Sequence, residues 1–71
     1  MSDNVYSITE IAGSSSESVE AAIDNALARA RKTLRNLDWF ELTEVRGHLG
    51  EDGTVAHYQV ALKLGPRMEE V

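Results

Sequence analysis

The C-terminal half of the chain has the pattern of a β-hairpin, and this feature constrains the fold more than any other. Two runs typical of strands, WFELTEVRGHL and VAHYQVALKLG, are separated by residues 50–54. This connection contains Asp52-Gly53, and glycine takes positive φ without steric cost, so a tight reversal is favoured. In the second run every other residue is apolar, which predicts one buried strand face. That face consists of Tyr58, Val60, Leu62 and Leu64.

The segment SSSESVEAAIDNALARARKTLRNL has a different period, with apolar residues three and four positions apart. This spacing predicts one amphipathic helix that begins near Ser16, and the serines at its start are natural N-caps. Acidic side chains occupy its first half and basic ones its second half, the order that the helix dipole favours. The basic residues are Arg29, Arg31, Lys32 and Arg35.

An earlier run, Val5 to Ala12, is rich in β-branched and aromatic residues and stops at Gly13, which predicts a first strand. The chain then has an α+β fold: strand-helix-strand-strand, with a three-stranded antiparallel sheet packed around one helix. Such a sheet is all antiparallel only if the last strand lies in the centre. Residues 1–71 should form a single domain, and residues 1–4 and 69–71 are expected to be flexible ends.

The first strand of the hairpin does not alternate regularly. Phe40 and Leu42 keep one parity, but Val45 breaks it. Positions that a simple sheet would bury are occupied by Glu44, Arg46 and His48. A β-bulge, or a partner on the second face of the sheet, would explain this pattern.

Trp39 and Phe40 must point to opposite faces of the strand. We predict that Phe40 supplies the core aromatic, which leaves Trp39 on the uncovered face together with Gln59. An indole beside a carboxamide could stack on a planar heterocycle and bind its polar edge. A tryptophan that only packs at a subunit contact is the alternative.

Composition excludes several classes of function. A net charge of -5 argues against binding to duplex nucleic acid or anionic membranes. No apolar run is long enough to span a bilayer and no leader pattern is present, so a cytoplasmic protein is expected. There is no nucleophile motif, phosphate-binding loop or metal-ligand spacing, and no cysteine, so we expect neither an enzyme nor a metalloprotein.

A 71-residue chain without disulfides has a thin core. Oligomerisation is then the remaining common way to stabilise the fold.

The whole order of segments resembles the dodecins, small flavin-binding proteins with a strand-helix-strand-strand fold. The resemblance runs from about Val5 to Met68. Its most specific pieces are LDWFE, VRGH and AHYQV followed by LKLG. It implies a hollow homododecamer that holds flavins in pairs between tryptophans of symmetry-related subunits.

The resemblance also implies individual site residues. Trp39 matches the tryptophan that stacks on the flavin isoalloxazine ring, and Gln59 matches the glutamine that hydrogen-bonds the pyrimidine edge of that ring. Glu44 falls at an acidic position near the flavin in some members. Arg46 and Arg67 fall at basic positions that in bacterial members lie near the flavin phosphate or bridge subunits.

The sequence departs from the family at Pro66, where dodecins usually carry an apolar residue before the arginine. Proline lacks a backbone N–H and has a fixed φ, so a different path to Arg67 is expected.

The resemblance to the dodecins implies sequestration of FMN, riboflavin or FAD, for storage or photoprotection and without turnover. Coenzyme A is a further candidate ligand. The alternatives are a structural homo-oligomer and a coenzyme A-binding protein.

Overall fold

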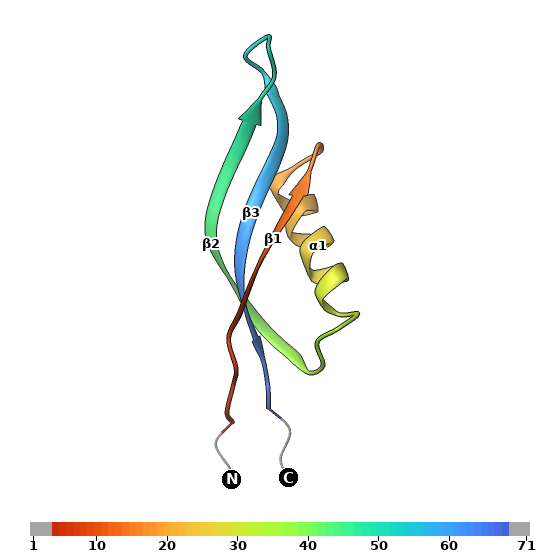
Figure 1. The fold of residues 1–71 in the computed structure, drawn as a ribbon, viewed down its shortest axis with the longest axis vertical. Helices are drawn as coiled ribbons and strands as arrows, with labels where there is room; N and C mark the ends of the chain where they lie inside the picture. Colours follow the sequence, from red (N-terminus) through yellow and green to blue (C-terminus); the bar gives the residue numbers. More distant parts are fainter. Residues whose placement is uncertain (1–3, 69–71) are drawn as a thin grey trace.

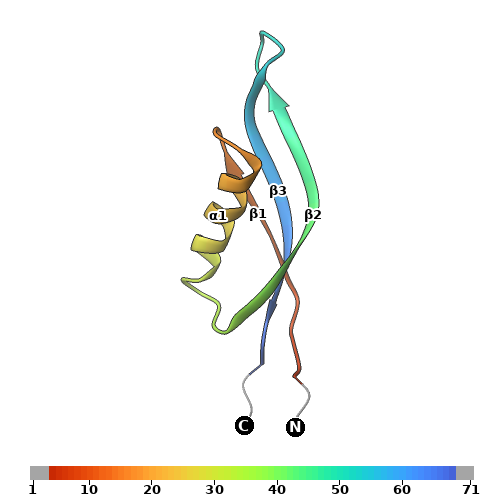
Figure 2. The ribbon, with the colours of Figure 1, turned by 180° about the vertical axis from the view of Figure 1, so that it is seen from behind.

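The computed structural model describes residues 4–68, and these residues contain three strands and one helix. In chain order they are β1 (Thr9–Ser15), α1 (Val19–Ala30), β2 (Leu37–Leu49) and β3 (Val55–Pro66). Figures 1 and 2 show a long, twisted β2–β3 ribbon with the helix against one side of its lower half. The α+β prediction is confirmed. The predicted flexible ends fall, except for Asn4, outside the described residues.

The sheet is antiparallel with the strand order β1-β3-β2, so the last strand lies in the centre as the sequence predicted. The predicted hairpin is also present. Gly53 has φ +83°, and the Gly50 and Thr54 backbones close the turn with a hydrogen bond of 2.8 Å. The Asp52 carboxylate accepts from both the backbone N–H and the hydroxyl of Thr54, and these bonds lower the pKa of Asp52.

The helix begins slightly later than the sequence indicated. Its N-cap is Ser18, whose hydroxyl accepts from the Ala21 N–H at 3.0 Å, rather than a serine near position 16. The hydroxyl of Ser15 accepts from the Glu17 N–H, so this serine shapes the connection that precedes the helix. Because several serines occur close together, the sequence alone does not decide which of them caps the helix.

The first strand also differs from its predicted bounds, because it begins at Thr9 and continues through Gly13 to Ser15. Gly13 is a strand residue against which the helix packs. A Cβ at this position would lie 2.6 Å from the Ala22 carbonyl oxygen and 2.7 Å from the Ala26 Cβ. The glycine therefore permits close packing of strand on helix, which a sequence cannot distinguish from a strand end.

The buried core lies between α1 and the strands β1 and β3. It consists of small helical residues facing aliphatic strand residues, namely Ala22, Ala26, Ala30, Val60, Leu62 and Leu64. The prediction that Phe40 supplies the core aromatic is wrong, because its side chain is 45% exposed. The helix packs on β1 and β3 (Figure 2). Apolar side chains of β2 that lie opposite the buried residues of β3 stay exposed on the same side of the sheet. No helix among residues 4–68 is long and apolar enough to cross a membrane.

A β-bulge at Thr43 explains the irregular alternation of β2. The register passes from Leu42 opposite Leu62 to Glu44 opposite Ala61, so Thr43 has no partner of its own. Its hydroxyl donates instead to the Ala61 carbonyl at 3.0 Å. One extra residue reverses the parity of the strand, which brings Val45 back to the apolar side.

Candidate ligand-binding face

The side of the sheet opposite α1 carries most of the residues that the sequence singled out. We call it the outer face, and it is formed by alternate residues of β2 and β3. Cross-strand register places Trp39 opposite Gly65, Arg46 opposite Gln59 and His48 opposite His57. The outer face comprises Trp39, Glu41, Glu44, Arg46 and His48 of β2, with His57, Gln59, Ala61, Lys63 and Gly65 of β3.

Trp39 lies across the backbone of β3 at one end of the outer face. Its indole covers Gly65, where any Cβ would overlap the ring. The ring of Tyr6 contacts it edge-on, with the centroids 5.9 Å apart and the planes at 64°. Trp39 is nevertheless 37% exposed. The indole is therefore supported from below and from one edge while part of its surface stays accessible.

The Tyr6 contact was not predicted from the sequence. The phenol donates to the Asp38 carboxylate at 2.8 Å, which ties the segment before β1 to the first residues of β2. This hydrogen bond to the neutral phenol, with some desolvation and the negative charge of Asp38, raises the pKa of Tyr6. The only sequence signal was an aromatic residue within a strand-like run, which does not reveal a partner 32 positions away.

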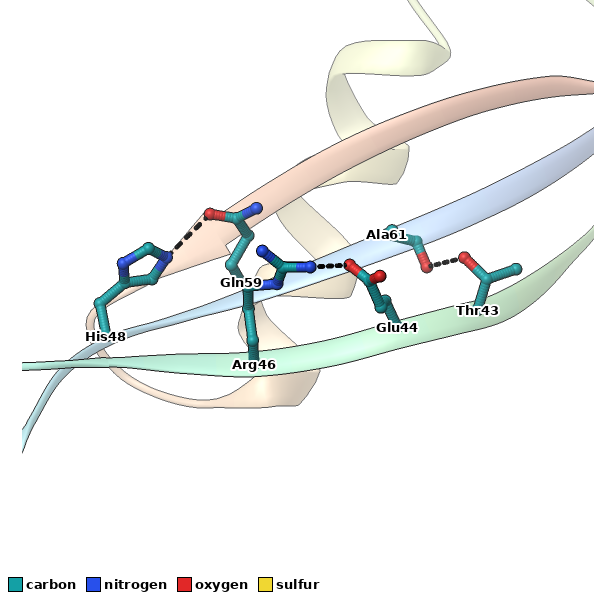
Figure 3. A network of polar contacts seen from close by, with 6 residues as sticks. All are labelled: Thr43, Glu44, Arg46, His48, Gln59 and Ala61. Carbon is teal, nitrogen blue, oxygen red and sulfur yellow. Dashed lines mark hydrogen bonds and ion pairs between the residues drawn. The ribbon is translucent and has the colours of Figure 1, made fainter.

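Gln59 lies near the middle of the outer face and its carboxamide already has a partner. Its Oε1 is 3.0 Å from Nε2 of His48. The His48 ring is stacked on His57, with centroids 4.3 Å apart and planes at 16°. Figure 3 shows the amide oxygen directed at His48 and the amide nitrogen on the side turned away from it.

Glu44 and Arg46 form an ion pair on the same face, in which the guanidinium donates to Glu44 Oε1. The two side chains are 55% and 53% exposed, respectively, so the pair contributes little to stability. The bulge at Thr43 is what puts both of them on the outer face rather than toward the core. Sequence parity alone would have buried them.

Arg67 lies beyond the end of β3, at the Trp39 end of the face. It forms an isolated antiparallel bridge with Tyr6, and its backbone N–H donates to the Asn36 carbonyl at 2.8 Å. Pro66 is buried as the last residue of β3 and its carbonyl accepts from the Ser7 N–H. The strand thus extends through the proline, and the arginine side chain is exposed beside Tyr6.

The structure does not bring Trp39 and Gln59 together within one chain. Trp39 is opposite Gly65, and Gly65 is six positions from Gln59 along β3. At a rise of roughly 3.3 Å per residue, the two positions are about 20 Å apart along the strand. The residues share a face, but one planar heterocycle cannot reach both in the same subunit.

Comparisons with known proteins establish the family of this chain. The family model described as Dodecin matches residues 5–69. The chain belongs to the dodecin family. It is 61% identical over 66 residues to a dodecin of Thermus thermophilus, covering 93% of this chain and 94% of that protein.

Solved dodecin structures have the same fold. A dodecin from Streptomyces davaonensis superposes with a TM-score of 0.90 at 51% identity, covering 97% of this chain and all of that one. A dodecin from Streptomyces coelicolor gives 0.89 at 56% identity over the whole of both chains. The strand-helix-strand-strand topology with its β2–β3 ribbon is thus the dodecin fold.

Proposed function

We propose that this dodecin-family chain binds and sequesters a flavin, FMN or the related riboflavin or FAD, on its outer face. One observation carries the proposal: the Trp39 indole is held across Gly65 by its backbone and by Tyr6, yet remains 37% exposed. A large aromatic surface that is fixed and accessible fits stacking on a planar ring system. Such stacking contributes roughly 1–3 kcal/mol for nucleobases, which resemble the flavin ring in planarity.

The other residues of the outer face fit the polar parts of a flavin. The Gln59 amide offers N–H donors to the carbonyl-bearing edge of the ring. Arg67, exposed beside Tyr6, would carry positive charge near a phosphate at the Trp39 end. Arg46 is a weaker candidate for the phosphate because its guanidinium already donates to Glu44.

The separation of Trp39 and Gln59 leads to a site shared between subunits. Because one chain holds the two residues about 20 Å apart, a flavin that uses both takes them from different copies. This agrees with self-assembly into a homododecamer. Uncovered apolar side chains of β2, among them Phe40 at 45%, Leu42 at 41% and Val45 at 50% exposure, supply a surface for contacts between copies.

Sequestration requires binding and exclusion of water but no proton transfer. A bound flavin would supply its own light absorption and redox chemistry. Trp39 would stack on the ring and quench its emission by donating an electron to the excited state, while Gln59 would fix the ring orientation. The outer face needs no acid or base for this task. Tight binding would lower the concentration of free flavin, and quenching of the bound flavin would suppress its photochemistry.

The first experiment is the absorption spectrum of the purified protein, followed by release and identification of any chromophore. FMN added to the ligand-free protein should lose its fluorescence. Trp39→Ala should keep the secondary structure but lower the FMN affinity at least tenfold, which is about 1.4 kcal/mol. It should also restore emission to the FMN that still binds.

Trp39→Phe is the matched variant, because it retains a stacking face and offers a poorer electron donor. Its affinity and quenching should lie between those of the parent and the alanine variant. A folded Trp39→Ala protein that binds and quenches FMN like the parent would refute the proposal. No chromophore and no quenching by the parent would instead support a purely structural oligomer, and a released coenzyme A would support that ligand.

A further inference from the structure

The contact between His48 and Gln59 joins an imidazole nitrogen to the oxygen of the amide. A carboxamide can be turned by 180° with little change in shape, and the two orientations exchange its donor and acceptor. Oε1 of Gln59 lies 3.0 Å from Nε2 of His48. Because a carbonyl oxygen only accepts, Nε2 of His48 is the donor in this contact in the tautomer that carries the ring proton on Nε2.

Two features hold the His48 ring where it can make this bond. The bulge at Thr43 places His48 on the outer face, opposite His57. The imidazoles of these two residues stack with 4.3 Å between centroids and 16° between planes, so the stack fixes the plane in which Nε2 points at Gln59. Figure 3 shows His48 and Gln59 joined across the two strands.

The other donor next to Gln59, Arg46, makes no hydrogen bond to the amide oxygen in the described part of the chain. Arg46 is the cross-strand neighbour of Gln59, but its guanidinium donates to Glu44. The orientation of the Gln59 amide is therefore set from the His48 side. The amide nitrogen, turned away from His48 in Figure 3, keeps its N–H groups for another acceptor.

We propose that His48 is a positioning residue that locks the Gln59 carboxamide with its oxygen bound and its NH₂ group directed at the ligand. The inference rests on the proposed flavin function for the identity of that ligand. It assigns to the site a preference for heterocycles that present a carbonyl acceptor to Gln59. Without His48 both amide orientations are available, and a carbonyl-bearing ring loses the advantage of a preset donor.

The first test uses the ligand-free oligomer and does not depend on flavin. Long-range ¹H–¹⁵N correlation spectra of the imidazoles report which ring nitrogen carries the proton. We expect the Nε2–H tautomer for His48. The Nδ1–H tautomer would make Nε2 an acceptor, which would take an N–H from Gln59 and overturn the proposal.

The second test measures FMN affinity in two matched variants and a control. His48→Phe keeps a ring to stack on His57 but cannot donate, whereas His57→Phe keeps both the stack and the His48–Gln59 bond. His48→Phe should weaken FMN binding by roughly two- to tenfold, the range expected for one neutral hydrogen bond. His57→Phe should lose less affinity than His48→Phe, and the control Glu20→Gln, on the exposed surface of α1, should bind like the parent.

A double-mutant cycle separates positioning from general packing. If His48 acts through Gln59, adding His48→Phe to Gln59→Ala should cause no further loss of FMN affinity. Additive losses would show that His48 acts independently of the amide and would refute the proposal. If the parent does not bind FMN while His48 is protonated on Nε2, the flavin function fails but the locked amide stands.

Discussion

The Trp39 indole is supported by residues from separate parts of the chain. Gly65 lies beneath the ring, and Tyr6 packs against its edge while its hydroxyl donates to Asp38 at 2.8 Å. Asp38 directly precedes Trp39, so the hydrogen bond anchors Tyr6 to the same stretch of β2 that carries the indole. A ring fixed before ligand arrives loses less conformational freedom on binding.

The Tyr6–Asp38 bond predicts a shifted titration. The carboxylate raises the pKa of Tyr6, so Asp38→Asn should lower this pKa toward the ordinary value of about 10. Because the folded-state pKa is above the unfolded one, the bond contributes stability below the unfolded pKa and loses it as the pH rises through the folded value. Phenolate absorbance in a Tyr58→Phe background measures the shift. Asp24→Asn, in the helix, is the control, and an unchanged pKa in Asp38→Asn would contradict the assignment.

Several residue-scale features were predictable because they follow from local periodicity. Alternation along β2 puts Trp39 on the face away from the helix, and the same period in β3 places Gln59 there. The partners of these residues were not predictable. Tyr6 on Trp39, and His48 on Gln59, depend on strand register and on a bulge, which no local pattern specifies.

At the scale of elements, the bulge at Thr43 determines which side chains of β2 lie on the outer face. It shifts the register by one residue, so Glu44, Arg46 and His48 lie on the outer face and Val45 returns to the apolar side. The sequence indicated an irregularity here but left a bulge and a covering partner as alternatives. The structure shows the bulge, with Thr43 donating to the Ala61 carbonyl.

Pairing of β2 with β3 places the Trp39 indole over Gly65, so a single methyl group added at position 65 should displace the ring. Gly65→Ala would put a Cβ into the Trp39 indole and displace the ring from its support. We expect the fold to persist and FMN affinity to fall at least tenfold, about 1.4 kcal/mol. Circular dichroism and fluorescence titration measure the two effects.

Gly47→Ala is the matched control for this glycine. Its Cβ would meet Val55 Cγ1 at 3.8 Å and the His57 carbonyl oxygen at 4.0 Å, which are ordinary contacts. This variant should bind FMN like the parent. Equal affinity of Gly65→Ala and the parent would show that the position of the indole over Gly65 does not matter for binding.

At the scale of the whole molecule, the helix is too narrow to cover the sheet. It packs on β1 and β3, and the apolar side of β2 stays exposed with Phe40, Leu42 and Val45. The sequence predicted an uncovered outer face but assigned Phe40 to the core. Periodicity gives the parity of a side chain, whereas the reach of one short helix across a twisted sheet depends on tertiary geometry.

The exposed apolar side chains of β2 predict how assembly can be disrupted. Light scattering of the parent should give the mass of a dodecamer. Val45→Glu places a charge on the exposed apolar side of β2 and should yield smaller species, because burial of an unpaired carboxylate at a contact is costly. Glu20→Gln, on the exposed surface of α1, should assemble normally. A parent that is a stable monomer would remove both the assembly and the shared site.

The distance between Trp39 and Gln59 allows assembly and ligand binding to be tested together. Trp39→Ala and Gln59→Ala should each weaken FMN binding, the latter by roughly 0.5–3 kcal/mol for a neutral hydrogen bond lost or left unpaired. If the two residues of one site come from different subunits, mixed oligomers of the two variants contain some sites with both residues intact. Denaturing and refolding the variants together should therefore restore a fraction of high-affinity, fully quenched FMN binding.

Oligomers of the Trp39→Ala, Gln59→Ala double variant mixed with either single variant should show no such recovery, because no site can then obtain both side chains. Failure of the two single variants to complement each other in confirmed mixed oligomers would mean that one subunit supplies both residues, which the extended β3 strand of this structure does not permit.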